Sequence, residues 1–520
     1  MNVKRNFPIS LLVVAAVVII SLGGLVWFFT QGMRTSARVP APDYWPTAGW
    51  QSTTPEEQGL DSDKLADGLL KMREQNVQIH SLLVIRNGYV VADATFYPYD
   101  GQTLHDVASV TKSMMTTLIG IAIDQGKLEL DDKMVSFFPD YSIANLDQRK
   151  EKITVRHLAS MSSGLDCTAE ADEKTLQEMV ASPDYEQFVL DRKVIWAPGE
   201  HFVYCSPAIH LLSPILQQAT GMTALDFARQ YLFEPLGIHD SMWEKGPKDF
   251  YDGWGDLSLL PHDMAKVGFL FLNKGQWEGE QIISRQWVEE ATKTQLVISD
   301  SEDSYGYGWW LDPAVEGGYR ADGRGGQYIF VLPEWDMIIV TTGGGFMMDE
   351  IAELLLASFS DFEEPLPADP EGVARLEAAI AAIDQPPALV PVAPLPEVAI
   401  LISGKTYVFE PNPAQLQSIA FEFDGSSEAT IFFEAEGRKV ASSSVGLDGV
   451  YRFSVGSDDR PTAYRGAWTD AQTFFLEYNG ITNNDHSLFQ LHFEGDQVDV
   501  KVQETAHDVG AHFVGRMQEP

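Results

Sequence analysis

A serine and a lysine three residues apart stand at the head of an unusually apolar segment. Ser109-Val110-Thr111-Lys112 is followed by residues 114–123, which carry apolar or small side chains on nearly every face. A helix of this composition is expected in a protein interior, and Asp124-Gln125-Gly126 provides a polar end with a glycine suited to terminating it. Residues i and i+3 lie on one face of a helix, so the Lys112 amine can reach the Ser109 hydroxyl.

This pair has the chemistry of an activated nucleophile. Burial disfavours the charged form of a lysine, so its amine can accept a proton near neutral pH. Backbone N–H groups at the start of a helix can stabilise the oxyanion that forms when the serine attacks a carbonyl group. Because Ser-x-x-Lys also occurs by chance in long chains, the assignment depends on the rest of the sequence.

The N-terminal region predicts export. Lys4 and Arg5 precede a long uncharged run with an apolar core at residues 9–29. That core is long enough to cross a bilayer of about 30 Å as a helix, and the two basic residues should stay in the cytoplasm. We expect a signal anchor in residues 1–33 and a tether at 34–54, with the remainder outside the cytoplasm. The alternative is a cleaved signal peptide and a secreted protein.

The order of predicted elements beyond the tether is that of an α+β domain. Asn87-Gly88 separates two β-rich runs and is a strong hairpin signal. Helices are expected at residues 208–220 and 224–231 and after Pro261, and the chain then turns to strands at 305–311, 328–332 and 337–342. We assign residues 55–361 to this catalytic domain.

The last third of the chain has a different composition. Residues 362–398 are expected to form a Pro-rich linker with a short helix at 372–383. Residues 399–520 consist of short alternating runs with Gly, Asp and Asn turns, which predict a small antiparallel barrel or sandwich. Ligand binding, contact with the catalytic domain and a purely structural role are all open for this domain.

Four motifs in sequence order resemble the serine β-lactamase and penicillin-binding-protein superfamily. They are Ser109-Val110-Thr111-Lys112; Arg156-His157-Leu158 with Ser163-Gly164-Leu165; Pro198-Gly199-Glu200 with Tyr204-Cys205-Ser206; and Gly323-Arg324-Gly325-Gly326-Gln327. Over residues 51–360 the chain is most similar to the β-lactamase-related serine hydrolases, which include carboxylesterases and 6-aminohexanoate-dimer hydrolases. The resemblance implies an antiparallel sheet flanked by helices, plus an all-helical subdomain.

The resemblance also implies roles for individual residues. Ser109 would attack the substrate carbonyl, and Lys112 would be its proton partner. Tyr204 would pass the proton to the leaving group and later help to activate water. The N–H groups of Ser109 and Gln327 would form the oxyanion hole.

Two motifs depart from the superfamily pattern. Ser206 stands where the second motif usually has Asn, so it keeps a polar group but loses the amide. Arg324-Gly325-Gly326 aligns with Lys-Thr-Gly, where Arg324 keeps a cation and Gly325 lacks the hydroxyl. Recognition of a β-lactam or D-Ala carboxylate is therefore less assured, although the glycines let a substrate approach the strand edge closely.

The two cysteines, Cys167 and Cys205, flank motifs assigned to the active site. In an exported chain such a pair predicts a disulfide, which would fix the tyrosine loop to the cleft wall; two buried free thiols are the alternative. No metal-ligand motif, nucleotide-binding loop or Gly-x-Ser-x-Gly elbow occurs, so we expect no metal or cofactor. The net charge of −39 argues against nucleic-acid binding.

These observations predict an exported, membrane-anchored serine hydrolase that cleaves a small-molecule or peptide ester or amide through an acyl-enzyme. The first alternative is a penicillin-sensitive D-Ala-D-Ala peptidase or a β-lactamase. The second, from another class, is a non-catalytic binding or sensor protein that retains the fold.

Overall fold

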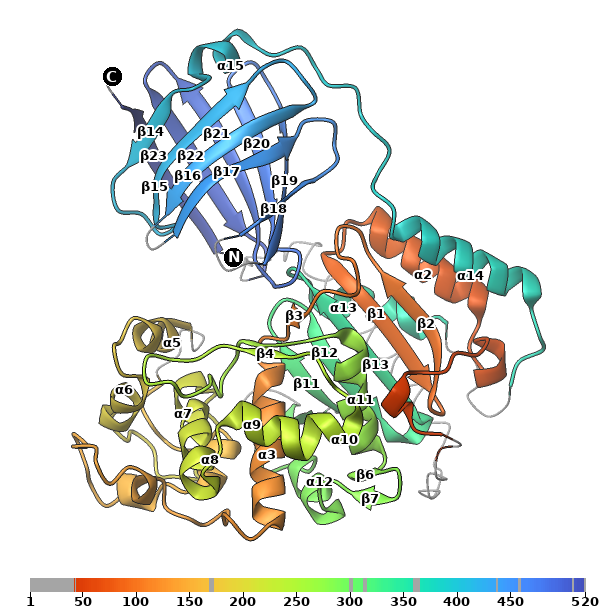
Figure 1. Cartoon of the computed structure of the whole chain (residues 1–520), viewed down its shortest axis with the longest axis vertical. Helices are drawn as coiled ribbons and strands as arrows, with labels where there is room; N and C mark the ends of the chain where they lie inside the picture. Colours follow the sequence, from red (N-terminus) through yellow and green to blue (C-terminus); the bar gives the residue numbers. More distant parts are fainter. Residues whose placement is uncertain are drawn as a thin grey trace, which may run out of the picture.

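The structure, a computed structural model, describes residues 42, 44–167, 173–298, 303–311, 316–358, 365–435, 438–456, 460–506 and 509–518. The predicted membrane-spanning segment at residues 9–29 lies outside these residues. Within the part that is described, every helix is too short or too polar to span a bilayer. The described residues form a catalytic domain and a C-terminal β domain (Figure 1).

The catalytic domain is built on one eight-stranded antiparallel sheet with the order β2-β1-β13-β12-β11-β10-β9-β8. The strands are β1 Ile79–Arg86, β2 Tyr89–Thr95, β8 Leu296–Val297, β9 Ser304–Tyr305, β10 Trp310–Leu311, β11 Tyr319–Gly323, β12 Gln327–Leu332 and β13 Met337–Gly343. Asn87 and Gly88 both have positive φ and form the predicted turn between β1 and β2. Small sheets add β3 His105–Asp106, β4 Met242–Trp243, β5 Leu257–Leu259, β6 Gln276–Trp277 and β7 Glu280–Gln281.

Helices cover both faces of this sheet. The α-helices are α2 Ser62–Glu74, α3 Val110–Asp124, α4 Val155–Ala159, α5 Glu173–Val180, α6 Tyr185–Asp191, α7 Ser206–His210, α8 Leu212–Thr220, α9 Ala224–Ala228, α10 Glu234–Leu236, α11 Pro261–Leu272, α12 Arg285–Ala291, α13 Asp349–Leu356 and α14 Pro370–Ile383. Helices α2, α13 and α14 share a core with one face, and α3 and α11 share a core with the other. Alternate residues of β1 enter the two cores, as the pleat requires.

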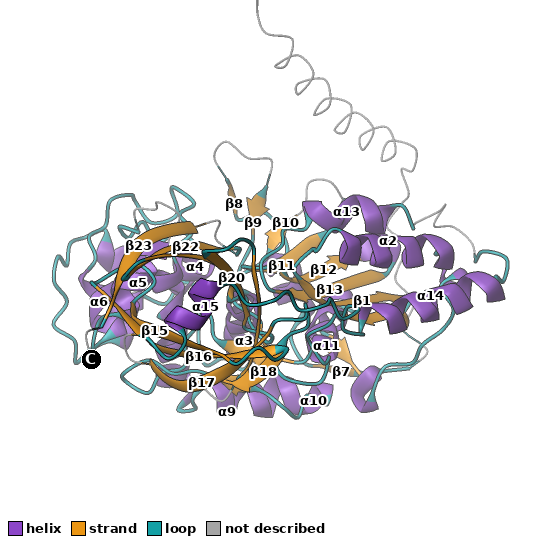
Figure 2. Cartoon of the chain, turned by 90° about the horizontal axis from the view of Figure 1, so that it is seen from above, coloured by secondary structure: helices purple, strands orange, loops and turns teal. Residues whose placement is uncertain are grey.

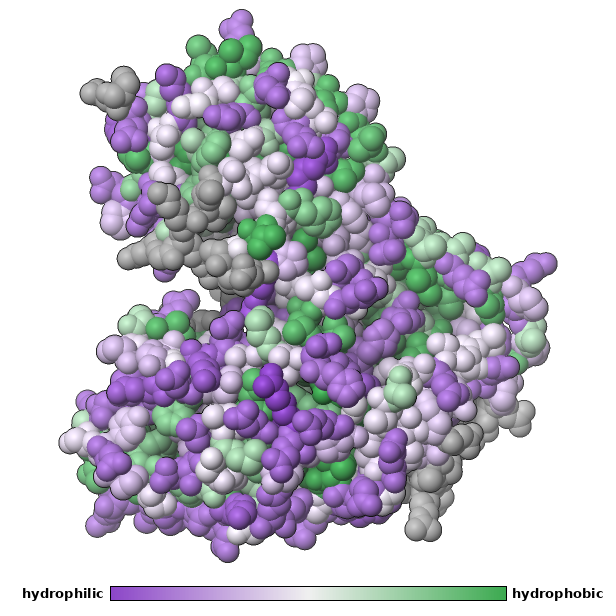
Figure 3. Space-filling model, viewed as in Figure 1, coloured by the Kyte–Doolittle hydropathy of each residue, from purple (hydrophilic) through white to green (hydrophobic). Residues whose placement is uncertain are grey.

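Short helical turns join these elements. They are η1 Pro46–Ala48, η2 Glu56–Gln58, η3 Met134–Phe137, η4 Lys150–Lys152, η6 Pro333–Trp335 and the π-helical turn η5 Arg229–Phe233. Helices α4 to α9 form the predicted helical subdomain beside α3 (Figures 1 and 2). The face of this subdomain that Figure 3 shows is mainly hydrophilic.

The serine helix α3 is buried along almost its whole length. Every residue from Val110 to Ala122 is buried, so the predicted interior helix is confirmed. It ends at Asp124, and Gly126 follows with φ 67°. Gly120 is required by packing, because an added Cβ would lie 2.4 Å from the Trp287 ring.

Two predicted segments differ from the structure. The expected helix at 208–220 is two helices, α7 and α8, which are separated at Leu211, although Gly221 terminates the second with φ 74° as predicted. The helix predicted within the linker is α14, and its buried face (Leu376, Ala379, Ile383) joins the core shared with α2. The catalytic domain therefore extends to α14, because this amphipathic helix packs along α2 (Figure 1) and shares a core with α2 and β2.

The C-terminal domain is a barrel rather than a sandwich. Its ten strands are β14 Thr406–Phe409, β15 Leu416–Phe423, β16 Glu428–Ala435, β17 Arg438–Gly446, β18 Arg452–Val455, β19 Pro461–Trp468, β20 Thr473–Asn479, β21 His486–Glu494, β22 Gln497–Glu504 and β23 Val509–Met517, preceded by α15 Glu397–Ile402. The sheet closes where β17, the first strand in the order, pairs with β19, the strand next to the other end. Its core is rich in aromatic side chains, including Tyr407, Phe421, Trp468, Phe474 and Phe493.

Candidate active site

The predicted nucleophile and its proton partner are in direct contact. Ser109 immediately precedes α3, and the Lys112 Nζ donates a hydrogen bond to the Ser109 Oγ at 2.6 Å. The same amine donates to the Trp254 carbonyl at 2.7 Å. Lys112 is 1% exposed, so these two acceptors fix an amine that is almost fully withdrawn from water. A lysine held in this way is oriented toward one hydroxyl.

Tyr204 lies beside the lysine amine. The Lys112 Nζ is 5.0 Å from the centroid of the Tyr204 ring. Trp310, on β10, stacks on Tyr204 with the ring centroids 5.8 Å apart and an interplanar angle of 27°. The structure thus brings Ser109, Lys112 and Tyr204 together from segments almost a hundred residues apart. Trp310 packs against the tyrosine ring.

The loop that carries Tyr204 is hydrogen-bonded to the residues just before the Ser163-Gly164-Leu165 motif. The N–H of Gly199 donates to Ser162 O, and the N–H of Val203 donates to Met161 O, both at 2.8 Å. Gly164 must be glycine, because its φ is 72° and an added Cβ would lie 2.2 Å from the Trp196 carbonyl oxygen. The segments that carry the Ser163-Gly164-Leu165 and Pro198-Gly199-Glu200 motifs therefore pack against each other and position Tyr204.

A disulfide closes the same pair of loops. Cys167 and Cys205 are bonded, with their Cα atoms 5.7 Å apart, so the predicted disulfide is present. Cys205 also precedes α7, and its Sγ accepts a hydrogen bond from the Ala208 N–H. The bond thus fixes the residue next to Tyr204 to the segment that follows the Ser163-Gly164-Leu165 motif.

The Gly323-to-Gln327 motif approaches the nucleophile from the sheet. Gly323 ends β11 and pairs with Gln327 at the start of β12. An added Cβ on Gly323 would lie 2.5 Å from Val107 O and 3.2 Å from Ser109 N, so the absence of a side chain allows this strand to reach Ser109. The turn between the strands needs glycine at Gly325 and Gly326, whose φ angles are 84° and 99°.

The remaining predicted site residues lie around this centre. Gln327 is buried, and its side chain donates to the carbonyls of Arg324 and Gly343 and accepts from the Gly343 N–H. Ser206 is buried at the first position of α7, two residues beyond Tyr204. All of the predicted site residues are thus on segments that meet at the head of α3.

The turn before Ser109 is held in an unusual conformation. Ala108 has φ 47°, in the left-handed region that favours glycine. The Asp106 Oδ1 accepts a hydrogen bond from the Ala108 N–H at 2.8 Å, which stabilises this backbone. His105 Nδ1 lies 2.8 Å from the Asp106 carbonyl oxygen, and its Nε2 lies 2.9 Å from His80 Nδ1. Burial lowers the pKa of His105 to about 4, so it is neutral and structural at physiological pH.

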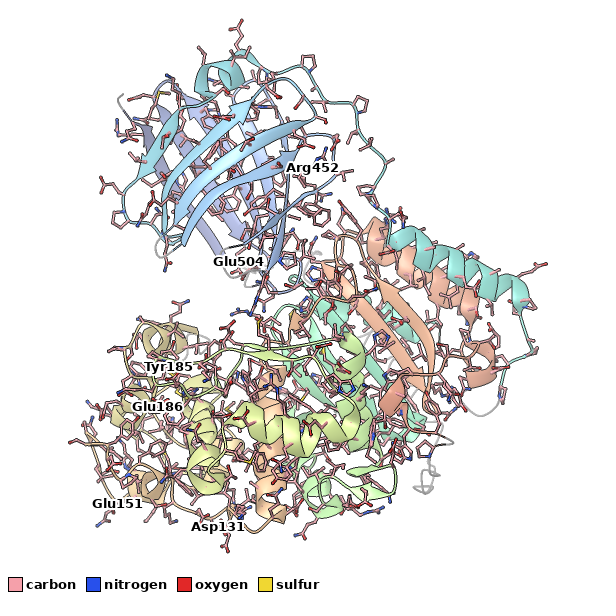
Figure 4. All side chains as sticks on the ribbon, viewed as in Figure 1. Asp131, Glu151, Tyr185, Glu186, Arg452 and Glu504 are labelled. Atoms are coloured by element: carbon pink, nitrogen blue, oxygen red, sulfur yellow. A yellow bond between two sulfur atoms is a disulfide. The ribbon has the colours of Figure 1, made fainter. Side chains whose placement is uncertain are left out.

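Buried carboxyl groups lie within and beside the loop that supplies the Trp254 carbonyl. Burial raises the pKa of Asp252 to about 8, and nearby Asp256 and Glu186 add to the shift. Glu186, on α6 with Tyr185 (Figure 4), lies 3.1 Å from His210 Nε2. Asp252 belongs to the loop, whereas Glu186 and His210 belong to the helical subdomain, so the cluster joins the loop to the subdomain.

Sequence reasoning missed three residues of the site. Trp254 acts through its backbone carbonyl, which no side-chain pattern reveals. Trp310 occurs in a strand that reads as ordinary core sequence. Asn484 belongs to the barrel, yet it exchanges hydrogen bonds with Arg324 at 3.1 and 3.3 Å. The pairing of distant segments, rather than any local motif, brings them to the site.

Comparison with known proteins agrees with this geometry. The Beta-lactamase family matches residues 63–344, more than half of the chain. A 6-aminohexanoate-dimer hydrolase of Paenarthrobacter ureafaciens is 26% identical over 311 residues, covering 55% of this chain and 78% of that protein. Penicillin-binding protein 4 of Amycolatopsis lactamdurans is 26% identical over 295 residues, covering 48% of this chain and 75% of that protein.

A solved structure has the same fold. It is a Bacillus anthracis protein assigned as a 6-aminohexanoate-dimer hydrolase, with a TM-score of 0.50 and 17% identity, covering 66% of this chain and 87% of that one. The family match, the relatives and the serine–lysine geometry lead to one conclusion: the chain belongs to the Beta-lactamase family and is a serine hydrolase of the β-lactamase and penicillin-binding-protein superfamily.

Proposed function

We propose that the protein is an exported, membrane-anchored enzyme that cleaves an ester or amide bond through an acyl-enzyme on Ser109. The observation that carries the proposal is the 2.6 Å contact between the Ser109 Oγ and the buried Lys112 amine, with the Tyr204 ring beside that amine. This arrangement supplies a nucleophile, a proton acceptor and a second acid/base group within one small volume.

Acylation requires one proton transfer in each direction. The Ser109 Oγ attacks the carbonyl carbon while its proton passes to the Lys112–Tyr204 pair. The tetrahedral intermediate collapses as the bond to the leaving oxygen or nitrogen breaks, and the Tyr204 hydroxyl returns the proton to that atom. The products of this half-reaction are an acyl-serine and a neutral alcohol or amine.

Deacylation uses the same groups in reverse. A water molecule loses its proton to the Lys112–Tyr204 pair and attacks the acyl carbon, and Ser109 leaves with a proton restored. In both steps the carbonyl oxygen carries negative charge. The N–H groups of Ser109 and Gln327 are the proposed donors to it, and the close approach of Gly323 to Ser109 N supports this assignment.

The substrate class rests on the relatives and on the altered third motif. One relative is named for hydrolysis of an aminohexanoate dimer, and another is named as a penicillin-binding protein. We favour an ester or amide hydrolase, because Gly325 lacks the hydroxyl that Lys-Thr-Gly offers to a carboxylate. The retained cation of Arg324 makes a penicillin-sensitive peptidase or β-lactamase the second candidate.

Active-site labelling tests the proposal. The full chain, solubilised in detergent, is treated separately with a fluorophosphonate and with a penicillin, and the adducts are located by peptide mass analysis. Ser109→Ala should abolish labelling, whereas Ser113→Ala removes another hydroxyl of the same buried helix and should retain it. A fluorophosphonate adduct on Ser109 without penicilloylation supports the ester or amide hydrolase. Stable penicilloylation would favour the second candidate, and no adduct from either reagent would favour a binding protein.

Export and anchoring are a separate part of the proposal. The Cys167–Cys205 disulfide suits an oxidising compartment outside the cytoplasm, and the apolar run at residues 9–29 is long enough to anchor the chain. Alkaline extraction of membranes should leave the protein in the pellet, with its original N-terminus by sequencing. A soluble protein that begins after residue 33 would instead indicate a cleaved signal peptide.

A further inference from the structure

One loop of the barrel is buried against the catalytic domain. Residues 480–485 connect β20 to β21, and the Thr482 carbonyl accepts a hydrogen bond from the Asp106 N–H at 2.8 Å. The Asn484 Nδ2 donates to the Arg324 carbonyl at 3.1 Å, and an Arg324 guanidinium N–H donates to the Asn484 Oδ1 at 3.3 Å. Asn484 is 4% exposed, so the contact between the two domains is buried at this residue.

Asn484 braces the turn that leads to Gln327. An added Cβ on Gly325 would lie 2.4 Å from the Asn484 Cβ, so the turn and the barrel residue are in tight contact. The Arg324 carbonyl that accepts from Asn484 also accepts from the Gln327 Nε2 at 3.2 Å. The Gln327 side chain is further bonded to Gly343 in both directions. The barrel therefore holds one side of the backbone on which the Gln327 N–H depends.

The same loop braces the backbone that leads to Ser109. Asp106, whose N–H binds the Thr482 carbonyl, uses its carboxylate to hold the Ala108 N–H at 2.8 Å. Ala108 is the left-handed residue next to Ser109. Arg460 of the barrel adds charge to this contact, with its guanidinium 3.6 Å from the Asp106 carboxylate. The orientation of the Ser109 N–H therefore depends on Asp106, which the barrel contacts at its backbone through Thr482 and at its carboxylate through Arg460.

Further contacts make this docking firm. Tyr99 of the catalytic domain shares an apolar cluster with Tyr451, Ala463 and Ile481 of the barrel. The Thr505 Oγ1 donates to the Gly344 carbonyl at 3.1 Å, beside Glu504 at the end of the barrel that faces the catalytic domain (Figure 4). The loop at residues 480–485 thus lies within a continuous interface.

We infer that the barrel contributes to the active site. Its loop at residues 480–485 positions both proposed oxyanion donors, the N–H groups of Ser109 and Gln327, and Asn484 is a positioning residue for Gln327. The inference rests on the proposed acyl-enzyme function. Because the oxyanion exists only in the transition state and the tetrahedral intermediate, loss of this support should lower kcat more than it changes KM.

The test is the kinetics of full-length Asn484→Ala with a short-chain nitrophenyl ester. We expect kcat to fall about 10- to 100-fold with KM within about threefold, since small misplacements of catalytic groups have effects of this size. Asn484→Asp keeps the acceptor for Arg324 but lacks the donor to the Arg324 carbonyl, and it should be as slow as the alanine variant. Asn412→Ala is the matched control, because Asn412 hydrogen-bonds within its own barrel loop and should keep the parental kcat.

Three outcomes would overturn the inference. The first is a kcat for Asn484→Ala within twofold of that for Asn412→Ala, and the second is a parental kcat for Asn484→Asp. If Asn484→Ala does not fold, Arg460→Gln tests the Ser109 side, and an unchanged kcat there is the third. Labelling of the parental enzyme distinguishes failure of this inference from failure of the proposed function. If the fluorophosphonate does not label Ser109 in the parental enzyme, the proposed function itself is refuted.

Discussion

Replacement of Lys112 by methionine separates the catalytic contribution of the amine from its contribution to folding. Methionine is unbranched like lysine and fits the same buried site, but it has no group that donates to Ser109 or accepts its proton. General acid/base catalysis contributes about 10²- to 10⁴-fold. We therefore expect kcat/KM for a nitrophenyl ester to fall by about that factor, which corresponds to about 3–5.5 kcal/mol of activation free energy.

The effect on stability should be much smaller. The Trp254 carbonyl loses its 2.7 Å hydrogen bond, and a buried polar group left unsatisfied costs about 1–3 kcal/mol. Removal of a buried amine offsets this loss, because its desolvation no longer opposes folding. We expect the free energy of unfolding to change by less than about 2 kcal/mol, measured by urea denaturation.

Lys150→Met is the matched control. Lys150 is also fully buried, and its Nζ donates to two backbone carbonyls, those of Ala144 at 2.8 Å and Leu190 at 2.6 Å. Both of these acceptors are backbone carbonyls and neither is the nucleophile Ser109, so the folded Lys150→Met variant should keep the parental kcat/KM. A Lys112→Met enzyme that retained kcat/KM within threefold would refute the catalytic reasoning, whatever its stability.

Three further predictions test the supports of the site. Cys167→Ser opens a loop of 38 residues and should lower the free energy of unfolding by about 4 kcal/mol on the chain-entropy relation, as seen in urea denaturation of the oxidised protein. Gly323→Ala places a Cβ 2.5 Å from Val107 O; the strand must move away from Ser109, and kcat should fall about 100-fold. Asp252 has a pKa raised from 3.8 to about 8, so the unfolded state loses this proton at lower pH than the folded state, and the group lowers stability progressively as pH rises from about 4 to 8. Asp252→Asn should therefore gain stability relative to the parent at pH 9 more than at pH 5, as measured by urea denaturation at the two pH values.

Local sequence determined much of the catalytic domain. The apolar run after Lys112 could only be a buried helix, because its side chains offer no polar face, and the spacing of Ser109 and Lys112 then follows from helix geometry. Asn87-Gly88 defined the first hairpin, because both positions adopt positive φ. The chemistry of the nucleophile was readable because it depends on two residues within one helical turn.

Tertiary structure decided which distant groups share that chemistry. The motif at Gly323 lies more than two hundred residues from Ser109, and only the pairing of the strands and the missing side chain bring the two into contact. Amphipathic α14 was read as part of a linker, since a sequence does not state which surface such a face covers. The role of Asn484 was equally invisible, because a polar loop residue acquires its function from the domain packed against it, and that packing is set by side chains far apart in the chain.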